Sequence, residues 1–256
     1  SGTDGEVSGT GSVRGPDAGG SGKGTDSDRG RLHGDVKPSI RDIAEEIKAA
    51  HPNADVDNWT DAPLTQLTTQ EVDGFSAAQA WTKNLAGADT YLLNTRGKGV
   101  ALDPKEGRVS RGETDFKNGT RIYVAADLPN AKGFSPARTA THESLHVMFR
   151  YMLDTESKNL RNSFRSLAMR NMTLLKGFNA FVSSPEGRLY NSNRVDINVR
   201  YEEYAAKLFA HQYGTEAEQK LIAEFIRGNI PNFPVEEYTK QMKALDELYA
   251  APKTVE

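Results

Sequence analysis

The sequence has no cysteine among its 256 residues, which excludes disulfide bonds and thiolate metal ligands. Any metal site must therefore use histidine and carboxylate side chains. No apolar run has the length of a membrane span, and no signal peptide opens the sequence. A net charge of −3 and a pI near 6.0 give no general attraction for nucleic acids or anionic membranes. We expect neither as a partner, and these features leave the cellular compartment open.

Large apolar side chains are almost missing from the first 36 residues, where Gly, Ser, Thr and Asp dominate. Such a segment buries too little surface to offset the entropy of ordering, so we expect residues 1–36 to be a disordered tail or linker. Gly20–Thr25 has the glycines of a phosphate-binding loop, but it lacks the G-x-x-x-x-G-K-[ST] spacing and a preceding strand. One folded domain is expected over residues 37–256.

Two helices are predicted ahead of a region with strand character. Ser39 and Asp42 form a capping pair for the first helix, and Pro52 ends it. The second helix is expected over residues 76–85, with Gly87 stopping it. Three strands are then expected, over residues 90–93, 99–102 and 121–126.

The second half of the chain has an almost entirely helical pattern. Helical spacing is kept by five residues, which are apolar except for the asparagine: Leu160, Phe164, Leu167, Asn171 and Leu174. Three basic residues between them are expected on the solvated face: Arg161, Arg165 and Arg170. Residues 183–198 predict an irregular loop. Three more helices are expected. The first covers residues 201–212, the second begins at a Thr215–Glu218 capping box, and the third covers residues 235–249. The predicted fold class is α+β, with a small antiparallel or mixed sheet before a mainly α-helical C-terminal half.

The most informative motif is His142-Glu143-Ser144-Leu145-His146. On an α-helix, residues i and i+4 lie on the same face, so both imidazoles can reach one ion. Glu143 lies about 100° round the helix, where its carboxylate can address a metal-bound water rather than the metal itself. Ser135 as N-cap and Pro136 at the first helical position mark the start of this helix.

This H-E-x-x-H arrangement resembles the active-site helix of the zincin metallopeptidases. The flanking positions also match that family, which keeps uncharged residues around the histidines: Thr139, Ser144, Leu145, Val147 and Met148. The resemblance implies a zincin-like fold and one Zn²⁺ ion per chain, held by His142 and His146. It also implies that Glu143 is the general base.

A strand shortly before the metal helix forms the sheet edge in zincin folds. The resemblance therefore implies that Ile122–Ala125 is the edge strand, and Asn118-Gly119 just before it is a hairpin signal. Such a strand either pairs with an extended peptide or belongs to the sheet without binding a ligand. The two interpretations have equal weight.

A catalytic zinc needs a third protein ligand and one open position. The extended motif with a third histidine is excluded, because Phe149 and Met152 occupy its glycine and histidine positions. The gluzincin class takes a glutamate from a later helix, often within a Glu-aromatic-x-Ala pattern. Residues 203–206, Glu-Tyr-Ala-Ala, match that pattern. The resemblance thus implies Glu203 as the third ligand; its neighbour Glu202 is the main alternative, and His211 is a weaker one.

The function implied by this resemblance is a zinc-dependent endopeptidase. The zinc ion would lower the pKa of its bound water, and Glu143 would carry the proton from that water to the leaving amine. A donor for the oxyanion is also expected. Five candidates for this donor stay open: Tyr190, Arg200, Tyr201, Tyr204 and His211.

The Gly-rich leader and a first residue that is Ser rather than Met indicate a domain released from a larger polypeptide. Phage proteins and bacterial toxin polyproteins carry peptidase-like domains in such settings, so the substrate would be a protein or peptide, its own precursor included. The alternative is a non-catalytic structural or binding module with a zincin fold. Glu143 argues against that alternative, since a structural site needs no base. A non-peptidase metal hydrolase is a third interpretation.

Overall fold

The computed structural model describes residues 38–104, 109–117, 119–130, 133–151, 160–190 and 195–250. These residues all belong to the unit that begins at Pro38. The expected tail over residues 1–36 lies outside the described residues. Helix α1, Ile40–Ala50, comes first and has the complete capping box between Ser39 and Asp42 that the sequence predicts.

A four-stranded mixed sheet follows, in the order β1-β2-β4-β3. Strand β2 (Asp89–Asn94) pairs parallel with β4 (Arg121–Ala125), and β1 (Thr60–Asp61) and β3 (Gly112–Asp115) pair antiparallel at the two ends. The strands predicted over 90–93 and 121–126 are confirmed. The strand predicted over 99–102 is wrong, and β1 and β3 were missed.

The prediction that Ile122–Ala125 is the edge strand is also wrong, because β4 pairs with β2 on one side and with β3 on the other. Among the described residues, β3 is the strand at this end of the sheet. The hairpin prediction is confirmed, since β3 and β4 run antiparallel and are adjacent along the chain. Gly119 in their connection has a φ of 75°, and Asn118 lies outside the described residues.

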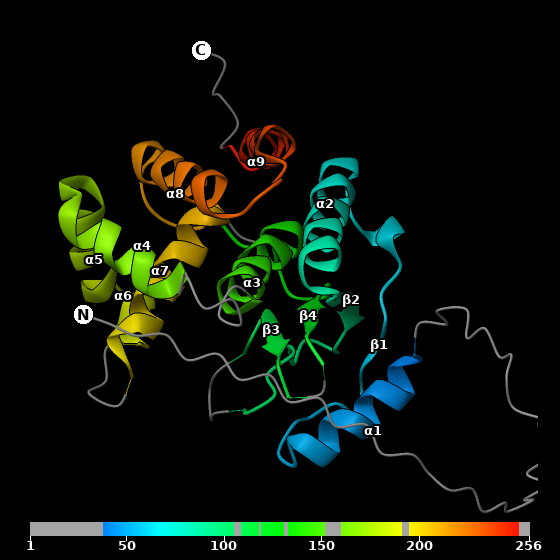
Figure 1. Cartoon of the computed structure of the whole chain (residues 1–256). Coiled ribbons are helices and arrows are strands. Elements are labelled where there is room, and N and C mark those ends of the chain that lie inside the picture. Colours follow the sequence, from blue (N-terminus) through cyan, green and yellow to red (C-terminus); the bar gives the residue numbers. More distant parts are fainter. Residues whose placement is uncertain are drawn as a thin grey trace, which may run out of the picture. The chain divides into compact units, whose positions relative to one another are not determined.

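The two faces of the sheet contact different cores. Side chains alternate along each strand, so Tyr91 and Tyr123 pack with α1, whereas Leu92 and Ile122 pack with the later helices. Figure 1 shows α1 on one side of the sheet and helices α2 (Thr69–Ala86) and α3 (Pro136–Tyr151) on the other. Helix α3, which carries the histidine motif, therefore packs against the face of the sheet opposite to α1.

Helix α2 is longer than the predicted 76–85, because Thr68 caps it at the backbone N–H of Glu71. Its C-cap Gly87 has a φ of 65° and ends the helix as predicted. Glu71 is buried and accepts a hydrogen bond of 2.9 Å from the backbone N–H of Ala137, in the first turn of α3. A Cβ on Gly74 would lie 3.1 Å from the Cβ of Ala137, so glycine lets α2 approach α3 closely. Both features fix the start of the metal-motif helix.

Helix α3 begins as the sequence predicts. The side chain of Ser135 accepts a hydrogen bond of 3.3 Å from the backbone N–H of Arg138, and Pro136 is the first helical residue. Almost every described side chain along α3 is buried, His142 and Glu143 included. The polar groups of the motif therefore sit inside the protein rather than on a solvated helix face.

The rest of the described chain is helical, which confirms the α+β class. The helices are α4 (Leu160–Arg170), α5 (Met172–Ser183), α6 (Pro185–Arg188), α7 (Ile197–Phe209), α8 (Glu216–Asn229) and α9 (Val235–Leu248). The pattern read as one helix from Leu160 to Leu174 is two helices, because Asn171 caps α5 instead of continuing α4. The loop predicted over 183–198 contains the short helix α6, and Asp196 starts α7 earlier than expected. The Thr215–Glu218 capping box is confirmed.

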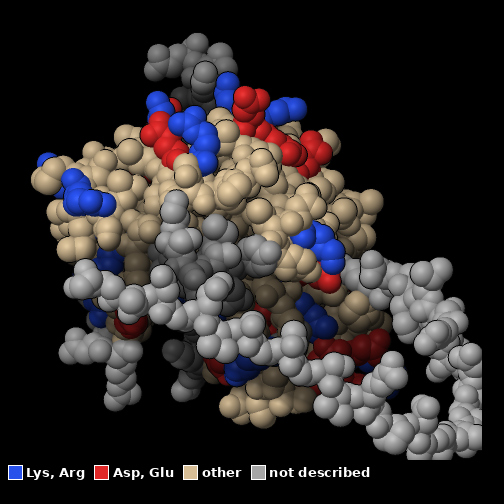
Figure 2. Space-filling view, in the orientation of Figure 1, with Lys and Arg blue, Asp and Glu red and all other residues tan. Residues whose placement is uncertain are grey.

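The surface has mixed charge. On the face drawn in Figure 2, acidic and basic side chains lie side by side at the top of the view, over helices α8 and α9. Within the part of the chain that the structure describes, no helix combines the length and the apolarity needed to cross a membrane.

Candidate metal centre

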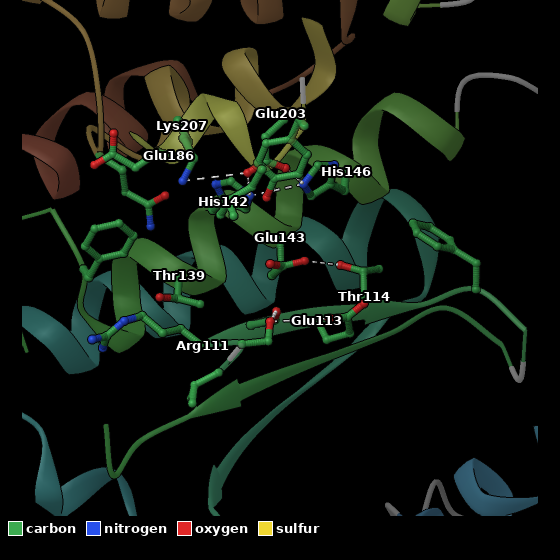
Figure 3. A pocket seen from close by; sticks show the side chains of 18 of the residues that line it. Arg111, Glu113, Thr114, Thr139, His142, Glu143, His146, Glu186, Glu203 and Lys207 are labelled. Atoms are coloured by element: carbon green, nitrogen blue, oxygen red, sulfur yellow. Dashed lines mark hydrogen bonds and ion pairs between the residues drawn. The ribbon is translucent and has the colours of Figure 1, made fainter. Parts of the chain in front are cut away.

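His142 and His146 lie one turn apart on the same face of α3, and their Nε2 atoms are 3.2 Å apart. Glu203 comes from α7 and faces both rings. Its Oε1 is 3.4 Å from Nε2 of His142, and its Oε2 is 3.6 Å from Nε2 of His146. Figure 3 shows the three side chains meeting on the helical side of a cavity. Three potential ligand atoms from two helices therefore converge on one point.

The spacing of these atoms fits a tetrahedral metal ion. Bonds of about 2.0–2.1 Å at tetrahedral angles put neighbouring ligand atoms roughly 3.3–3.4 Å apart. The two imidazole nitrogens are 3.2 Å apart, and each lies 3.4 or 3.6 Å from a different oxygen of Glu203, so the three side chains are within reach of one ion. His142, His146 and Glu203 form a group that could hold a metal ion, and a His/His/Glu donor set is one that Zn²⁺ accepts.

The electrostatics of the group point the same way. Burial lowers the pKa of His146, but hydrogen bonds with Glu202 and Glu203 outweigh burial and raise it well above its ordinary value. Burial raises the pKa of Glu203, yet the charge of His142 and hydrogen bonds from both histidines hold it well below its ordinary value. The group thus stabilises a carboxylate at Glu203 with a positive charge beside it, and a bound cation would supply that charge in place of the proton of His146, which must leave before Nε2 can bind a metal.

Glu202 contacts the other ring nitrogen of His146 and is not part of the group formed by His142, His146 and Glu203, called the ligand group below. Its Oε1 is 2.7 Å from Nδ1 of His146, and its other oxygen pairs with the guanidinium of Arg161 on α4. When Nδ1–H donates to Glu202, the lone pair of Nε2 is left to face His142 and Glu203. Of the two adjacent glutamates, the structure places Glu203 in the ligand group and gives Glu202 the position that orients a ligand.

Two sequence expectations change with this geometry. The prediction that Arg161 lies on a solvated face is wrong, because its side chain is only 20% exposed and pairs with the buried Glu202. The group that orients His146, which could not be named from the sequence, is Glu202. His142 differs from His146, since its buried Nδ1 has no hydrogen-bond partner among the described residues.

Glu143, the predicted base, points from α3 toward strand β3 (Figure 3). It is buried, and its Oε2 accepts a hydrogen bond of 2.7 Å from the hydroxyl of Thr114. A Cβ on Gly112 would lie 2.8 Å from Oε1 of Glu143 and 2.5 Å from Cγ2 of Thr139. Only glycine fits there without displacing these groups. Strand β3 therefore holds the carboxylate through Thr114 and leaves space for it at Gly112.

A cavity of about 480 Å³ lies between β3 and helices α3, α6 and α7. The ligand group and Glu143 form part of its wall, and apolar side chains from other elements, Val109, Phe116, Phe134 and Leu189, complete it. The site therefore combines a possible metal position, a buried carboxylate and space for a ligand.

Of the five residues considered as oxyanion donors, Tyr190 lines this cavity. The other four have contacts elsewhere. The hydroxyl of Tyr204 donates to Glu218, the ring of Tyr201 stacks on Phe178, His211 pairs with Asp246, and Arg200 donates to the carbonyl of Val195. Lys207 also lines the cavity and was missed. Its signal in the sequence was its position four residues after Glu203, on the same face of α7.

Comparisons of the chain with protein-family models, with curated proteins and with solved structures found no match.

Proposed function

We propose that the protein is a zinc-dependent endopeptidase of the zincin type, with His142, His146 and Glu203 as the zinc ligands. The observation that carries this proposal is the position of Glu143. Its carboxylate lines the same cavity as the three ligands and accepts a 2.7 Å hydrogen bond from Thr114 of the end strand. A site that only held a metal would need the three ligands, but it would not need a buried, oriented base beside them.

The chemistry assigned to each group follows from its place. A zinc ion bound by the three ligands supplies a Lewis acid and lowers the pKa of water to about 7. Glu143 accepts the proton of the attacking water through the oxygen that Thr114 leaves free, and then returns it to the departing amine. Glu202 and Arg161 hold the ring of His146 in one orientation throughout.

The substrate proposed is an extended segment of a protein. Strand β3 pairs with β4 on one side, and residues 110–114 line the cavity on the other. An extended peptide can add to such a strand by backbone hydrogen bonds, which places its carbonyl groups along the cavity without requiring a chain end. The role of peptide-binding edge, one of the two interpretations considered for Ile122–Ala125, is thus proposed for Gly112–Asp115.

The test combines metal content with proteolysis. Purified protein should contain one zinc per chain by elemental analysis, and His142→Ala should lose it. The loaded protein should cleave an unfolded protein such as casein, or a longer precursor of this chain, and a chelator should stop the cleavage. Zinc-loaded protein that cleaves neither substrate would replace the proposal with the non-catalytic binding module.

A further inference from the structure

Lys207 is a buried ammonium group inside the cavity. It lies on α7, one turn after Glu203, and its side chain is only 10% exposed. Burying an ammonium group is costly unless an opposite charge or a hydrogen-bond acceptor compensates it. Lys207 is also part of the cavity wall, on the same side as the ligand group (Figure 3). Its position therefore needs an explanation that the three metal ligands and the base do not give.

The contacts of Lys207 keep its ammonium group pointing at the site. Its Nζ is 3.8 Å from Oε1 of Glu203, the oxygen that also faces His142. The ring of Phe134 lies 5.4 Å from the same nitrogen, at a distance typical of a cation–π contact. Arg111 contacts that ring too, also at 5.4 Å. The ammonium group of Lys207 thus contacts both the ring of Phe134 and the carboxylate of Glu203, and all three side chains line the cavity.

Metal binding changes the charge balance around Lys207. In the protein alone, the carboxylate of Glu203 neutralises the buried ammonium. A divalent cation bound by Glu203 would take over that carboxylate, and the charges of Glu143 and Glu203 together would only balance the ion. The other carboxylates of the cavity wall, Glu113 and Glu186, are matched in number by Arg111 and Arg150, so Lys207 would be left as excess positive charge. Such a site favours a ligand that brings an anionic oxygen.

We propose that Lys207 binds the anionic oxygen that develops on the substrate, which makes it the oxyanion donor of the site. This inference rests on the proposed function. As the oxygen of water bonds to the carbonyl carbon, the π electrons of the carbonyl move to its oxygen and the proton of the water passes to Glu143. An N–H of Lys207 donates to that oxygen and remains on nitrogen. When the C–N bond breaks, the electrons return to form the carbonyl, and Glu143 gives its proton to the amine.

Two rival roles must be separated from this one. Lys207 could act only on Glu203 and position the ligand, in which case the metal affinity would depend on it. Alternatively, Tyr190, which also lines the cavity, could be the donor. A small tetrahedral anion tests all three roles without a substrate, because it presents the same type of oxygen to the site.

The experiment uses the full chain loaded with Co²⁺, whose visible absorption reports its ligands. Inorganic phosphate and neutral imidazole are titrated into the wild type and into Lys207→Met, Lys207→Arg, Tyr190→Phe and Arg111→Gln. Arg111→Gln is the matched control, because it removes another cation from the same ring of Phe134. We expect phosphate affinity to fall about 10- to 100-fold in Lys207→Met, the range for a lost hydrogen bond to a charged group. Lys207→Arg should recover most of it, and imidazole binding and Co²⁺ affinity should stay within about threefold.

The outcomes discriminate between the roles. Phosphate affinity in Lys207→Met equal to the wild type would overturn the inference. An equal loss of phosphate affinity in Arg111→Gln would also overturn it, because the effect would then come from the general positive potential of the cavity. A greater loss in Tyr190→Phe would do the same. A fall of Co²⁺ affinity in Lys207→Met that accounts for the phosphate effect would make Lys207 a positioning residue. If the wild type shows no Co²⁺ spectrum that His142→Ala removes, the proposed metal site fails, and that failure is visible before any phosphate is added.

Discussion

Replacing Glu202 with glutamine tests how the metal site is organised behind its ligands. The two side chains have nearly the same size, so packing is preserved while the charge is removed. In the wild type, one carboxylate oxygen lies 2.7 Å from Nδ1 of His146 and the other pairs with Arg161. Glutamine has one acceptor and one NH₂ group. Whichever way the amide turns, its NH₂ must face a donor, either the imidazole N–H or the guanidinium.

The expected loss follows from these contacts. Groups that orient a metal-binding histidine typically contribute 10- to 100-fold to metal affinity, and we expect Glu202→Gln to weaken zinc binding by about that factor. A buried charge left without its partner costs about 3–5 kcal/mol. Because Arg161 keeps one fifth of its side chain exposed, we expect a smaller fall in the free energy of unfolding, about 2 kcal/mol.

Zinc affinity would be measured by competition with a chromogenic chelator at fixed pH, and stability by denaturant unfolding of the metal-free protein. Glu203→Gln, one residue further along α7, is the matched control and should lose zinc binding altogether. If Glu203→Gln keeps wild-type affinity and Glu202→Gln loses it, the two roles are reversed. If neither change affects zinc, the ion binds somewhere else.

Three further changes test other parts of the site and its support. Glu143→Gln should keep its zinc and its fold but lose about 10² to 10⁴-fold in peptide hydrolysis, measured on the same substrate with equal metal content. Equal activity would remove Glu143 from the mechanism. Gly112→Ala should cost about 1–3 kcal/mol in unfolding free energy and lower kcat by pushing Glu143 aside, since the new Cβ would lie 2.8 Å from its Oε1. An Ala variant with normal stability and kcat would show that β3 yields easily. Asp127 accepts hydrogen bonds from the backbone N–H groups of Thr95 and Gly97, and these outweigh burial and hold its pKa below the ordinary value. A depressed folded-state pKa stabilises the protein above the unfolded pKa of about 3.9 and loses its effect as pH falls through the folded pKa. Asp127→Asn should therefore be less stable at pH 7 by about 1 kcal/mol, and the difference should vanish in acid. A difference that persists unchanged at pH 2 would contradict this origin.

Local hydrogen-bonding signals in the sequence were sufficient to predict several helix ends. The caps at Ser39, Ser135 and Thr215 and the stop at Gly87 all involve residues within a few positions of each other. Such contacts form in any structure that contains the helix. The start of α2 was missed because its first turn, residues 69–72, has a single apolar side chain, Val72, and buries the charged Glu71, so it gives no apolar period to detect.

The strand beside the site could not be predicted in the same way. Residues 112–115 read Gly-Glu-Thr-Asp, which has neither β-branched alternation nor an apolar face. They form a strand because β4 offers its free edge and the β3–β4 connection closes the hairpin. The strand thus depends on tertiary contacts, and the only sign of it in the sequence is the turn signal at Gly119. The same limit explains the wrong edge assignment, since the edge is defined by the missing neighbour of a strand and not by its residues.

The choice between Glu202 and Glu203 shows where helical periodicity stops being informative. Adjacent residues differ by about 100° on a helix, so both glutamates lie within reach of α3 and only the rotation of α7 decides which one meets the ligands. That rotation is set by packing. Ala206, at i+3 from Glu203, is fully buried, and this small residue on the Glu203 face allows α7 to approach closely. With Glu203 turned to the ligand group, Lys207 at i+4 follows it into the cavity, and Glu202 is turned toward Arg161 of α4. One rotation of α7 thus assigns three roles: the proposed ligand, the proposed oxyanion donor and the group that orients His146.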